Sequence, residues 1–219
     1  DLHSFPTRRS SDLLSMSLKL VLDLDRTLFR TSDLDEAEWG LLGQQFGIDS
    51  KAELARRTDF YVRDEKAYYY DFAAHVREAG LGEEAVFAFL LQSTLADGRM
   101  EYDGVAELVT WAKQRGTVHV LTYGPANYQR FKAALCPSLK GAEIITTLQS
   151  KGDYFREQYL TGEVWMVDDK PIGGDLPDNV RFIQTAEYNG IAAPEHPAWP
   201  VATALSQIPG IIGNDELSN

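Results

Sequence analysis

The amino-acid sequence predicts an α/β fold with one parallel β-sheet, and two observations lead to this class. First, short apolar runs rich in Val, Ile, Leu and aromatic residues alternate with segments in which apolar residues recur at helical spacing. Second, this alternation is broken once, over residues 30–100, where helical patterns occur without a convincing strand. Strands joined by single helices form a parallel sheet that helices cover on both faces. We therefore expect a Rossmann-like sheet core with helices on both faces and an inserted α-helical cap.

Five strands are expected, each short and rich in β-forming residues. They cover residues 19–25, 117–122, 143–147, 163–168 and 180–184. The helices between them include "GVAELVTWAKQRG", which we expect Gly116 to end, and "ANYQRFKAAL". In sheets of this kind the ligand site lies beyond the carboxyl ends of the strands, so polar residues at those ends are the candidates for chemistry.

These patterns divide the chain into a core and an insertion. Residues 16–29 and 101–212 form the expected core domain, and residues 30–100 form the expected helical cap domain. Within the cap, the expected helices are "DLDEAEWGLLGQQFG", "RDEKAYYYDFAAHVREAG" and "EEAVFAFLLQSTLADG". After a Pro-rich stretch that starts at Ala192 we expect a closing turn and helix, and then an acidic tail over residues 213–219.

Residues 1–13, "DLHSFPTRRSSDL", are polar, lack periodicity and end just before a plausible start at Met16. They match, residue for residue, one reading frame of a widely used sequencing-library adapter. We therefore expect this segment to be a sequencing artefact rather than native protein, the alternative being a natural disordered arm. For this reason we leave it out of the expected fold.

Composition narrows the classes of function. The protein has 219 residues, a formal net charge of -12 and a sequence pI near 4.7, which argues against broad contact with nucleic acid or an anionic membrane. No apolar run approaches the roughly 20 residues that a membrane span needs, and no signal peptide is expected before the first motif. The single Cys136 excludes an intramolecular disulfide. We expect a cytoplasmic protein that is a monomer or a small homo-oligomer.

The stretch "LKLVLDLDRTLFRT" places Asp23 and Asp25 at the end of an apolar strand, with Thr27 two residues further on. Two carboxylates this close repel each other unless a cation lies between them. Magnesium takes oxygen ligands and keeps positions for water and a substrate phosphate. With the ion present, one aspartate can attack phosphorus and the other can move a proton. The same residues also suit a strand that simply ends in a turn or a helix cap.

Polar groups follow three further strands at corresponding places. Thr122 ends the second strand, where its hydroxyl and the following backbone N–H groups can hold a phosphate oxygen. Lys151 stands where a helix begins after the third strand, and its ammonium group can neutralise phosphate and nucleophile together. Asp168 and Asp169 end the apolar fourth strand, which is costly unless they are exposed or bind a cation. Each feature alone has a plain structural interpretation, but four consecutive strands of this kind point to one phosphoryl-transfer site.

With these residues, the sequence between positions 18 and 184 resembles the haloacid dehalogenase-like (HAD) superfamily of phosphohydrolases. The resemblance implies that Asp23, in the first motif "DLDRT", is the nucleophile and that Asp25 is the general acid and base. Thr122 matches the second motif, and Lys151 matches the third. The expected phosphate-binding residues are these two, together with Tyr123 and Gly124.

The resemblance also implies a Mg2+ cofactor. In this family the ion is held by the nucleophile, the backbone carbonyl of the second aspartate and an acid of the fourth motif. Here these are Asp23, Asp25 and, as our first choice, Asp169, with Asp168 as the alternative. The common glycine-aspartate form of the fourth motif carries another acid four residues on, but Gly173 stands there in this chain. The paired-acid form of the motif matches instead.

The second aspartate favours a phosphatase, because the true dehalogenases of the family lack it. A helical insertion between the first and second motifs resembles the family's lid over small substrates. We therefore expect a magnesium-dependent phosphatase that hydrolyses a small phosphorylated metabolite, a phosphomonoester, through an aspartyl-phosphate intermediate. The alternatives are a phosphomutase that uses the same chemistry and a non-catalytic binding or regulatory protein on the same fold.

The cap stretch "FYVRDEKAYYYDF" leaves two interpretations open. In the first, Tyr68, Tyr69 or Tyr70 stacks on a base or sugar of the substrate, and Arg63 anchors a second anionic group. In the second, a helix packs these aromatic side chains into the core of the cap and keeps its charges in water. We favour the packing interpretation.

Overall fold

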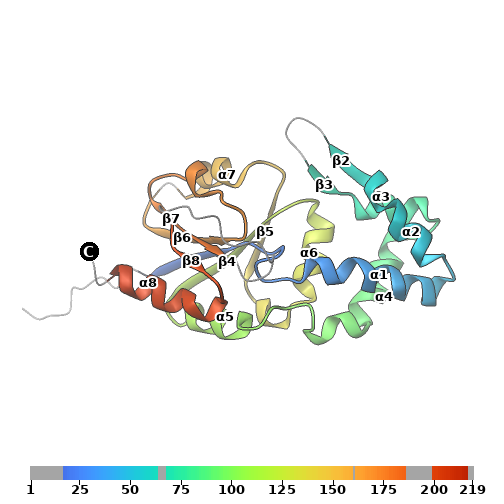
Figure 1. The fold of residues 1–219 in the computed structure, drawn as a ribbon, viewed down its shortest axis with the longest axis horizontal. Helices are drawn as coiled ribbons and strands as arrows, with labels where there is room; N and C mark the ends of the chain where they lie inside the picture. Colours follow the sequence, from blue (N-terminus) through green and yellow to red (C-terminus); the bar gives the residue numbers. More distant parts are fainter. Residues whose placement is uncertain (1–16, 64–67, 160, 186–198, 217–219) are drawn as a thin grey trace, which may run out of the picture.

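A computed structural model of the protein describes residues 17–63, 68–159, 161–185 and 199–216 (Figure 1). The adapter-like segment 1–13 and the last residues of the expected tail lie outside this part of the chain. The closing helix, α8 (Ile208–Glu216), continues four residues beyond the expected end of the core at residue 212. Within the described residues, no helix is both long enough and apolar enough to cross a membrane.

A six-stranded parallel sheet forms the core, in the order β5-β4-β1-β6-β7-β8. The five expected strands are confirmed with small changes at their ends. The strands are β1 (Leu18–Leu22), β4 (Gly116–Tyr123), β5 (Glu143–Thr147), β6 (Val164–Asp168), β7 (Val180–Thr185) and β8 (Val201–Ala202). Strand β8 was not expected, because two residues are too few to show a period.

Helices cover both faces of the sheet, as expected. In Figure 1, α7 (Lys151–Gln158) lies above it, and α5 (Val105–Lys113) and α8 lie below it. Because side chains alternate along a strand, β1 contributes Leu20 and Leu22 to the core cluster with α5 and α8, and Val21 to the cluster with α7. The hydrophobic runs that predicted the strands therefore reflect a sheet that is buried on both sides.

Gly116 has a different role from the expected one. Helix α5 ends at Lys113, and Gly116 is the first residue of β4, paired with Leu18 of β1. A Cβ atom at this position would lie 1.9 Å from the carbonyl oxygen of Leu18. The glycine is therefore needed for the close approach of two strands and not for ending the helix.

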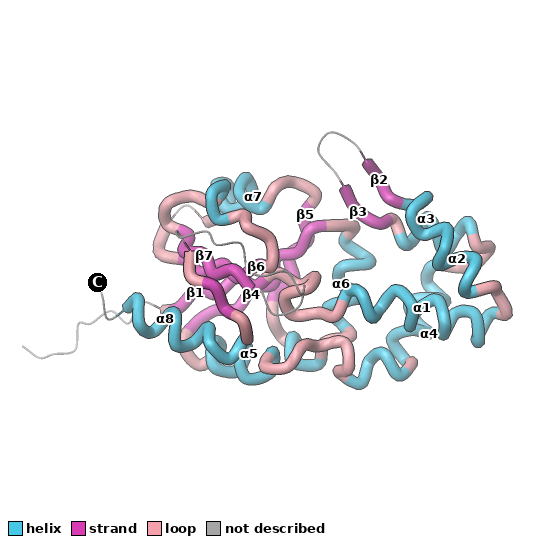
Figure 2. The backbone as a smooth tube through the Cα atoms, in the orientation of Figure 1, coloured by secondary structure: helices cyan, strands magenta, loops and turns pink. Residues whose placement is uncertain are grey.

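The inserted segment forms its own group of helices at one end of the molecule, beside the sheet (Figure 2). Its helices are α1 (Thr31–Phe46), α2 (Ser50–Arg56), α3 (Phe72–Glu78) and α4 (Glu83–Gln92). Helix α6 (Ala126–Ala134), which follows β4, lies next to this group (Figure 1), and its Tyr128 contacts Phe72 with ring centroids 4.7 Å apart.

The expectation of a strand-free insertion with a helix across residues 63–80 is wrong. Strands β2 (Tyr61–Arg63) and β3 (Tyr68–Tyr70) pair antiparallel, and α3 begins only at Phe72. Consecutive tyrosines favour an extended chain. Asp71 then caps α3, because its carboxylate accepts a hydrogen bond of 2.9 Å from the backbone N–H of Ala74.

Candidate active site

Two neighbouring strands carry aspartates to the same face of the sheet. Along β1 and β6, Asp23 follows Val21 and Asp168 follows Met166 at the two-residue period, and both apolar residues pack towards α7. The backbone N–H of Asp23 still donates to the carbonyl of Val167, at 2.9 Å, so this residue remains tied to the sheet. The two carboxylates therefore point towards the helix that follows β5.

Lys151 is the first residue of that helix, as expected. Ser150 caps α7 by accepting a hydrogen bond of 3.1 Å from the backbone N–H of Asp153, which fixes where the helix begins. The ammonium group of Lys151 donates to Asp23 Oδ1 and, at 2.6 Å, to Asp168 Oδ2. The structure thus brings together three residues whose positions span much of the sequence.

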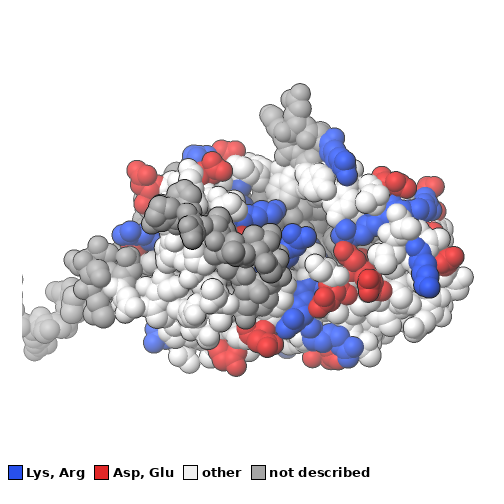
Figure 3. Space-filling model, in the orientation of Figure 1, with Lys and Arg blue, Asp and Glu red and all other residues white. Residues whose placement is uncertain are grey.

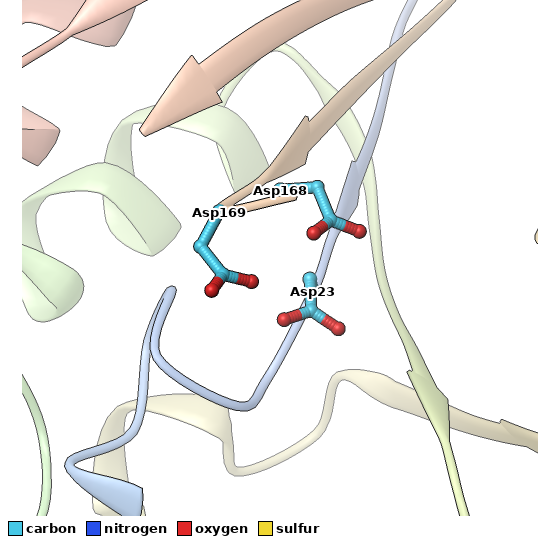
Figure 4. Close-up of side chains that lie close together, drawn as sticks. All are labelled: Asp23, Asp168 and Asp169. Carbon is cyan, nitrogen blue, oxygen red and sulfur yellow. The ribbon is translucent and has the colours of Figure 1, made fainter. Parts of the chain in front are cut away.

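Asp169 completes a group of three carboxylates. One oxygen from each of Asp23, Asp168 and Asp169 lies within 4.8 Å of the others. Figure 4 shows the three carboxyl groups gathered between the ends of β1 and β6. Carboxylate oxygens at this spacing are the hard donors that Mg2+ prefers, so the residues present suit this ion.

Burial and mutual charge shift the pKa values of these groups. Burial raises the pKa of Asp23 to about 7, against the opposing charge of Lys151 and with support from the charge of Asp168. Burial likewise raises the pKa of Asp168. For Lys151, burial lowers the pKa, but the charges of Asp168 and Asp23 outweigh it and raise the pKa overall. Asp23 and Asp168 therefore share one ammonium group beside a third carboxylate, an arrangement that a divalent cation would stabilise.

Asp25 points away from this group because the chain turns at Arg26, which has a φ of 62° in the left-handed region. Its carboxylate lies 2.5 and 2.7 Å from the ammonium group of Lys132 and accepts a hydrogen bond of 2.7 Å from Thr31 Oγ1. Burial raises the pKa of Asp25, but Lys132 and the hydrogen bonds outweigh it, so the pKa falls below its ordinary 3.8. Without a substrate bound, these contacts favour the base form of Asp25.

The expected phosphate-binding residues after β4 separate into two groups. Tyr123 lines a cavity together with Lys151, whereas Thr122 is fully buried and donates to Gln129 Oε1 at 3.0 Å. The backbone N–H of Gly124, expected to face phosphate, instead donates to the carbonyl of Thr147 at 3.0 Å. Its φ of 141° shows that glycine is required for backbone shape at this point.

The cavity lies between the carboxyl edge of the sheet and the inserted helices, with a volume of about 490 Å³. In the space-filling view, basic side chains gather near the middle of the molecule, between these two parts (Figure 3). The lining includes Asp23, Asp25, Tyr123, Gln129, Lys132, Lys151, Asp168 and Asp169 from the core, and Arg57, Tyr61, Tyr68, Tyr69 and Tyr70 from the insertion. A cavity of this size accommodates a small metabolite.

Sequence reasoning missed Lys132, Gln129 and Arg57. The first two lie on α6, where Tyr128 and Phe131 mark the buried stripe. A lysine four residues after Tyr128 falls on that stripe, and this placement is a signal of a buried, paired charge. Arg57 carries no comparable signal, because its partner Asp35, at 2.9 Å, belongs to another helix of the insertion.

No family model matches the sequence, and no curated protein matches it either. Solved structures do match over most of their length. One is a haloacid dehalogenase-like hydrolase from Burkholderia xenovorans, with a TM-score of 0.60 and 18% identity over 85% of this chain and 93% of that one. Another is the HAD-hydrolase YfnB from Bacillus subtilis, solved with bound magnesium, with a TM-score of 0.60 and 16% identity over 90% of this chain and 98% of that one.

A third similar structure is CbbY from Rhodobacter sphaeroides in complex with phosphate, with a TM-score of 0.54 and 14% identity over 88% of this chain and 96% of that one. These identities are low, so the likeness concerns the course of the chain. In this chain that course comprises the parallel sheet and the insertion after its first strand. This chain therefore has the fold of the haloacid dehalogenase-like hydrolases.

Proposed function

We propose that this protein is a magnesium-dependent phosphatase that hydrolyses a small phosphomonoester through an aspartyl-phosphate on Asp23. The observation that carries the proposal is the meeting of Asp23 with Lys151, Asp168 and Asp169 beyond the ends of β1 and β6, at the floor of the cavity. The fold, shared with a hydrolase solved with magnesium and with CbbY solved with phosphate, supports the same chemistry.

Asp23, the backbone carbonyl of Asp25 and one acid after β6 would hold Mg2+. Both carboxylate oxygens of Asp168 already accept hydrogen bonds, from Lys151 at 2.6 Å and from the backbone N–H of Lys170 at 2.8 Å. Asp169, whose carboxylate belongs to the same group, is our choice for the acid that reaches the metal. The ion supplies positive charge that offsets the negative charge of the phosphoryl group and its nucleophile.

In the first step, a carboxylate oxygen of Asp23 attacks phosphorus, and the bond from phosphorus to the ester oxygen breaks. Asp25 gives the leaving oxygen the proton that it took from water in the second step of the preceding turnover. In the second step, Asp25 takes a proton from water as the water oxygen attacks phosphorus. The bond between Asp23 and phosphorus then breaks, and inorganic phosphate is released.

Lys151 and Lys132 have separate roles in this scheme. Lys151 lies beside Asp23 and is placed to bind the negatively charged phosphoryl oxygens. Lys132 pairs with Asp25 and favours the base form that the second step requires. The insertion acts as a cap, because Arg57 and the tyrosines of β2 and β3 line the side of the cavity opposite the sheet.

Hydrolysis of 4-nitrophenyl phosphate by the purified protein tests the proposal. Activity should require Mg2+, disappear with excess EDTA and return when Mg2+ is added. Asp23→Asn should abolish both turnover and the phosphorylated protein detected by intact mass after a rapid acid quench. Asp103→Asn, which changes a side chain that is 97% exposed, is the matched control and should keep activity.

Full activity in EDTA, or a phosphoenzyme that survives Asp23→Asn, would overturn the mechanism. A folded protein that binds inorganic phosphate but hydrolyses no ester in a broad panel would instead favour the non-catalytic alternative.

A further inference from the structure

The cap side of the cavity is lined mainly by aromatic rings. Tyr61, Tyr68, Tyr69 and Tyr70 line it from the hairpin of β2 and β3, and Tyr123 lines it from the end of β4. Tyrosine offers a large, rigid contact surface with little conformational freedom to lose. This lining needs an explanation, because a phosphatase step on the floor of the cavity makes no use of it.

The pairing of the hairpin sets three of these rings in a row. Tyr61 pairs with Tyr70, and Arg63 pairs with Tyr68, so all four side chains lie on one face of the hairpin. The ring of Tyr61 stacks on that of Tyr68, with centroids 5.1 Å apart and planes 25° apart, and on that of Tyr70, at 5.7 Å and 30°. The Arg57 guanidinium lies over the Tyr70 ring at 4.5 Å, which extends the row.

The two ends of this row differ in burial. Tyr70 is 6% exposed, and its hydroxyl lies 2.7 Å from His75 Nδ1, so it belongs to the core of the cap. Tyr68 is 60% exposed although it continues the same stack along the cavity wall. Packing therefore explains Tyr70, in agreement with the second interpretation of the cap sequence. Tyr68, with the guanidinium of Arg63 over its ring at 5.6 Å, keeps most of its surface accessible.

Tyr123 joins this row to the catalytic floor. It follows Thr122 at the end of β4, the strand next to β1. Its hydroxyl oxygen accepts a hydrogen bond of 3.1 Å from the backbone N–H of Tyr68. An aromatic wall thus runs along the cavity from the carboxyl edge of the sheet to the hairpin.

The charge at the cap end is balanced. Among the described residues that line the cavity from the insertion, Arg57 is the only cation. Its guanidinium pairs with Asp35 at 2.9 Å and donates to the Tyr61 hydroxyl at 2.6 Å. Arg63, over the ring of Tyr68, is not among the lining residues, so this end of the cavity suits an uncharged planar group better than a second phosphate.

We infer that Tyr68 and Tyr123 bind the base of a nucleoside monophosphate whose phosphate lies at Asp23 and Lys151, with the ring of Tyr61 supporting that of Tyr68. Every base presents a flat π face, and stacking on tyrosine uses that face without selecting one base. This inference rests on the proposed phosphatase function for the position of the phosphate. It adds the chemical class of the leaving group.

Ribose 5-phosphate and the nucleotides AMP and UMP provide a direct test, because all three release a primary alcohol and differ in the base. With Mg2+ present, kcat/KM should be at least about tenfold higher for AMP and UMP than for ribose 5-phosphate, mainly through KM. Calorimetry with the inactive variant Asp23→Asn should show that AMP and UMP bind at least about tenfold more tightly than ribose 5-phosphate.

Equal kcat/KM values, together with equal affinities, would overturn the inference while leaving the phosphatase function in place. If no ester is turned over, the phosphatase function fails, and the binding comparison still decides whether the tyrosines hold a base. Preference for ribose 5-phosphate over both nucleotides would show that the tyrosines bind the sugar and would also overturn the inference.

Variants separate the ring from the hydroxyl. Tyr68→Leu should lower the ratio of kcat/KM for AMP to that for ribose 5-phosphate by about fivefold or more, whereas Tyr68→Phe, which keeps the ring, should retain most of it. Leu91→Ala changes an exposed residue of α4 and is the matched control, with both substrates unaffected. Equal losses for both substrates in Tyr68→Leu would contradict the inference. If Tyr68→Leu does not fold, Tyr123→Leu removes the opposite part of the wall and gives the same test.

Discussion

The ammonium group of Lys132 contacts both carboxylate oxygens of Asp25, at 2.5 and 2.7 Å, and Lys132 is only 3% exposed. The pair joins the segment after β1 to α6. From the cap, Asp35 and Glu38 on α1 also lie close enough for the charge of Lys132 to lower their pKa values, although burial raises both overall. The positive charge of Lys132 therefore interacts with acidic residues of both the core and the cap. Its removal should affect both stability and catalysis.

Replacing Lys132 by Met should destabilise the protein at pH 7 by roughly 3 kcal/mol, because a carboxylate that is largely buried loses its partner. The pair lowers the pKa of Asp25, so its stabilising effect is present above the ordinary value of 3.8 and is lost as the pH falls through the lowered value. Urea unfolding at pH 7 and at pH 3 should show the difference shrinking in acid. Lys132→Arg keeps the charge and should lose less free energy of unfolding than Lys132→Met. Equal stability of Lys132→Met and the wild type at pH 7 would contradict this account.

Asp25→Asn should slow turnover by about 100- to 10,000-fold, because the amide cannot move a proton. Esters with a poor leaving group, such as glycerol phosphate, should lose more than 4-nitrophenyl phosphate, whose departing oxygen needs little protonation. The apparent affinity for Mg2+, measured by titration of activity, should stay near that of the wild type, since the backbone carbonyl remains. Equal losses for both esters, with weakened metal binding, would reverse the roles assigned to Asp23 and Asp25.

Glu38→Gln should stabilise the protein at pH 8 by about 1–2 kcal/mol. Glu38 is fully buried and accepts hydrogen bonds of 3.0 and 3.2 Å from the Tyr128 hydroxyl, while burial, and then the charge of Asp35, raises its pKa well above 4.5. A group whose pKa is raised by folding stabilises the fold fully when the pH is below its ordinary pKa. This contribution is lost as the pH rises through the pKa of the group in the folded protein. The advantage of Gln should therefore vanish near pH 4. Glu36→Gln, on the exposed face of the same helix, should change little at either pH.

Gly124→Ala should cost about 1–3 kcal/mol of stability and lower phosphatase activity strongly. The φ of 141° excludes an ordinary side chain, and the new Cβ would lie 2.5 Å from Gln129 Nε2. Gln129 holds Thr122 and the carbonyl of Tyr123, so its displacement disturbs the end of β4. Gly80→Ala is the matched control, because it shares a positive φ but meets no atom within 4 Å. Gly80→Ala should lower the free energy of unfolding by about 1 kcal/mol and leave activity unchanged. Similar activity in the two variants would rule out the role given to Gly124.

The sheet and the floor of the site follow from local sequence signals. Apolar runs predicted the five longer strands, and polar residues at their ends predicted that Asp23, Lys151, Asp168 and Asp169 would meet. This works because parallel strands bring their carboxyl ends to one edge of a sheet, so a pattern along the chain becomes a position in space.

The roof of the site could not be predicted in the same way. Three tyrosines in a row suit a buried helix and a strand alike, and the choice depends on pairing with Tyr61 across the hairpin. The pairing of Lys132 with Asp25 likewise joins residues on different elements. Such contacts join residues from different elements. The periodicity within one segment cannot predict which residue of another segment will lie opposite.

The position of β1 in the middle of the sheet also has a consequence for how the chain folds. Its two neighbours, β4 and β6, come from much later parts of the sequence, beyond the whole insertion. Contacts of such long range are slow to form, because a large loop must close before any pairing is gained. Asp23 therefore meets Lys151 and Asp168 only when the central strands are assembled, and recovery of catalytic activity during refolding should report completion of the sheet rather than early collapse or helix formation.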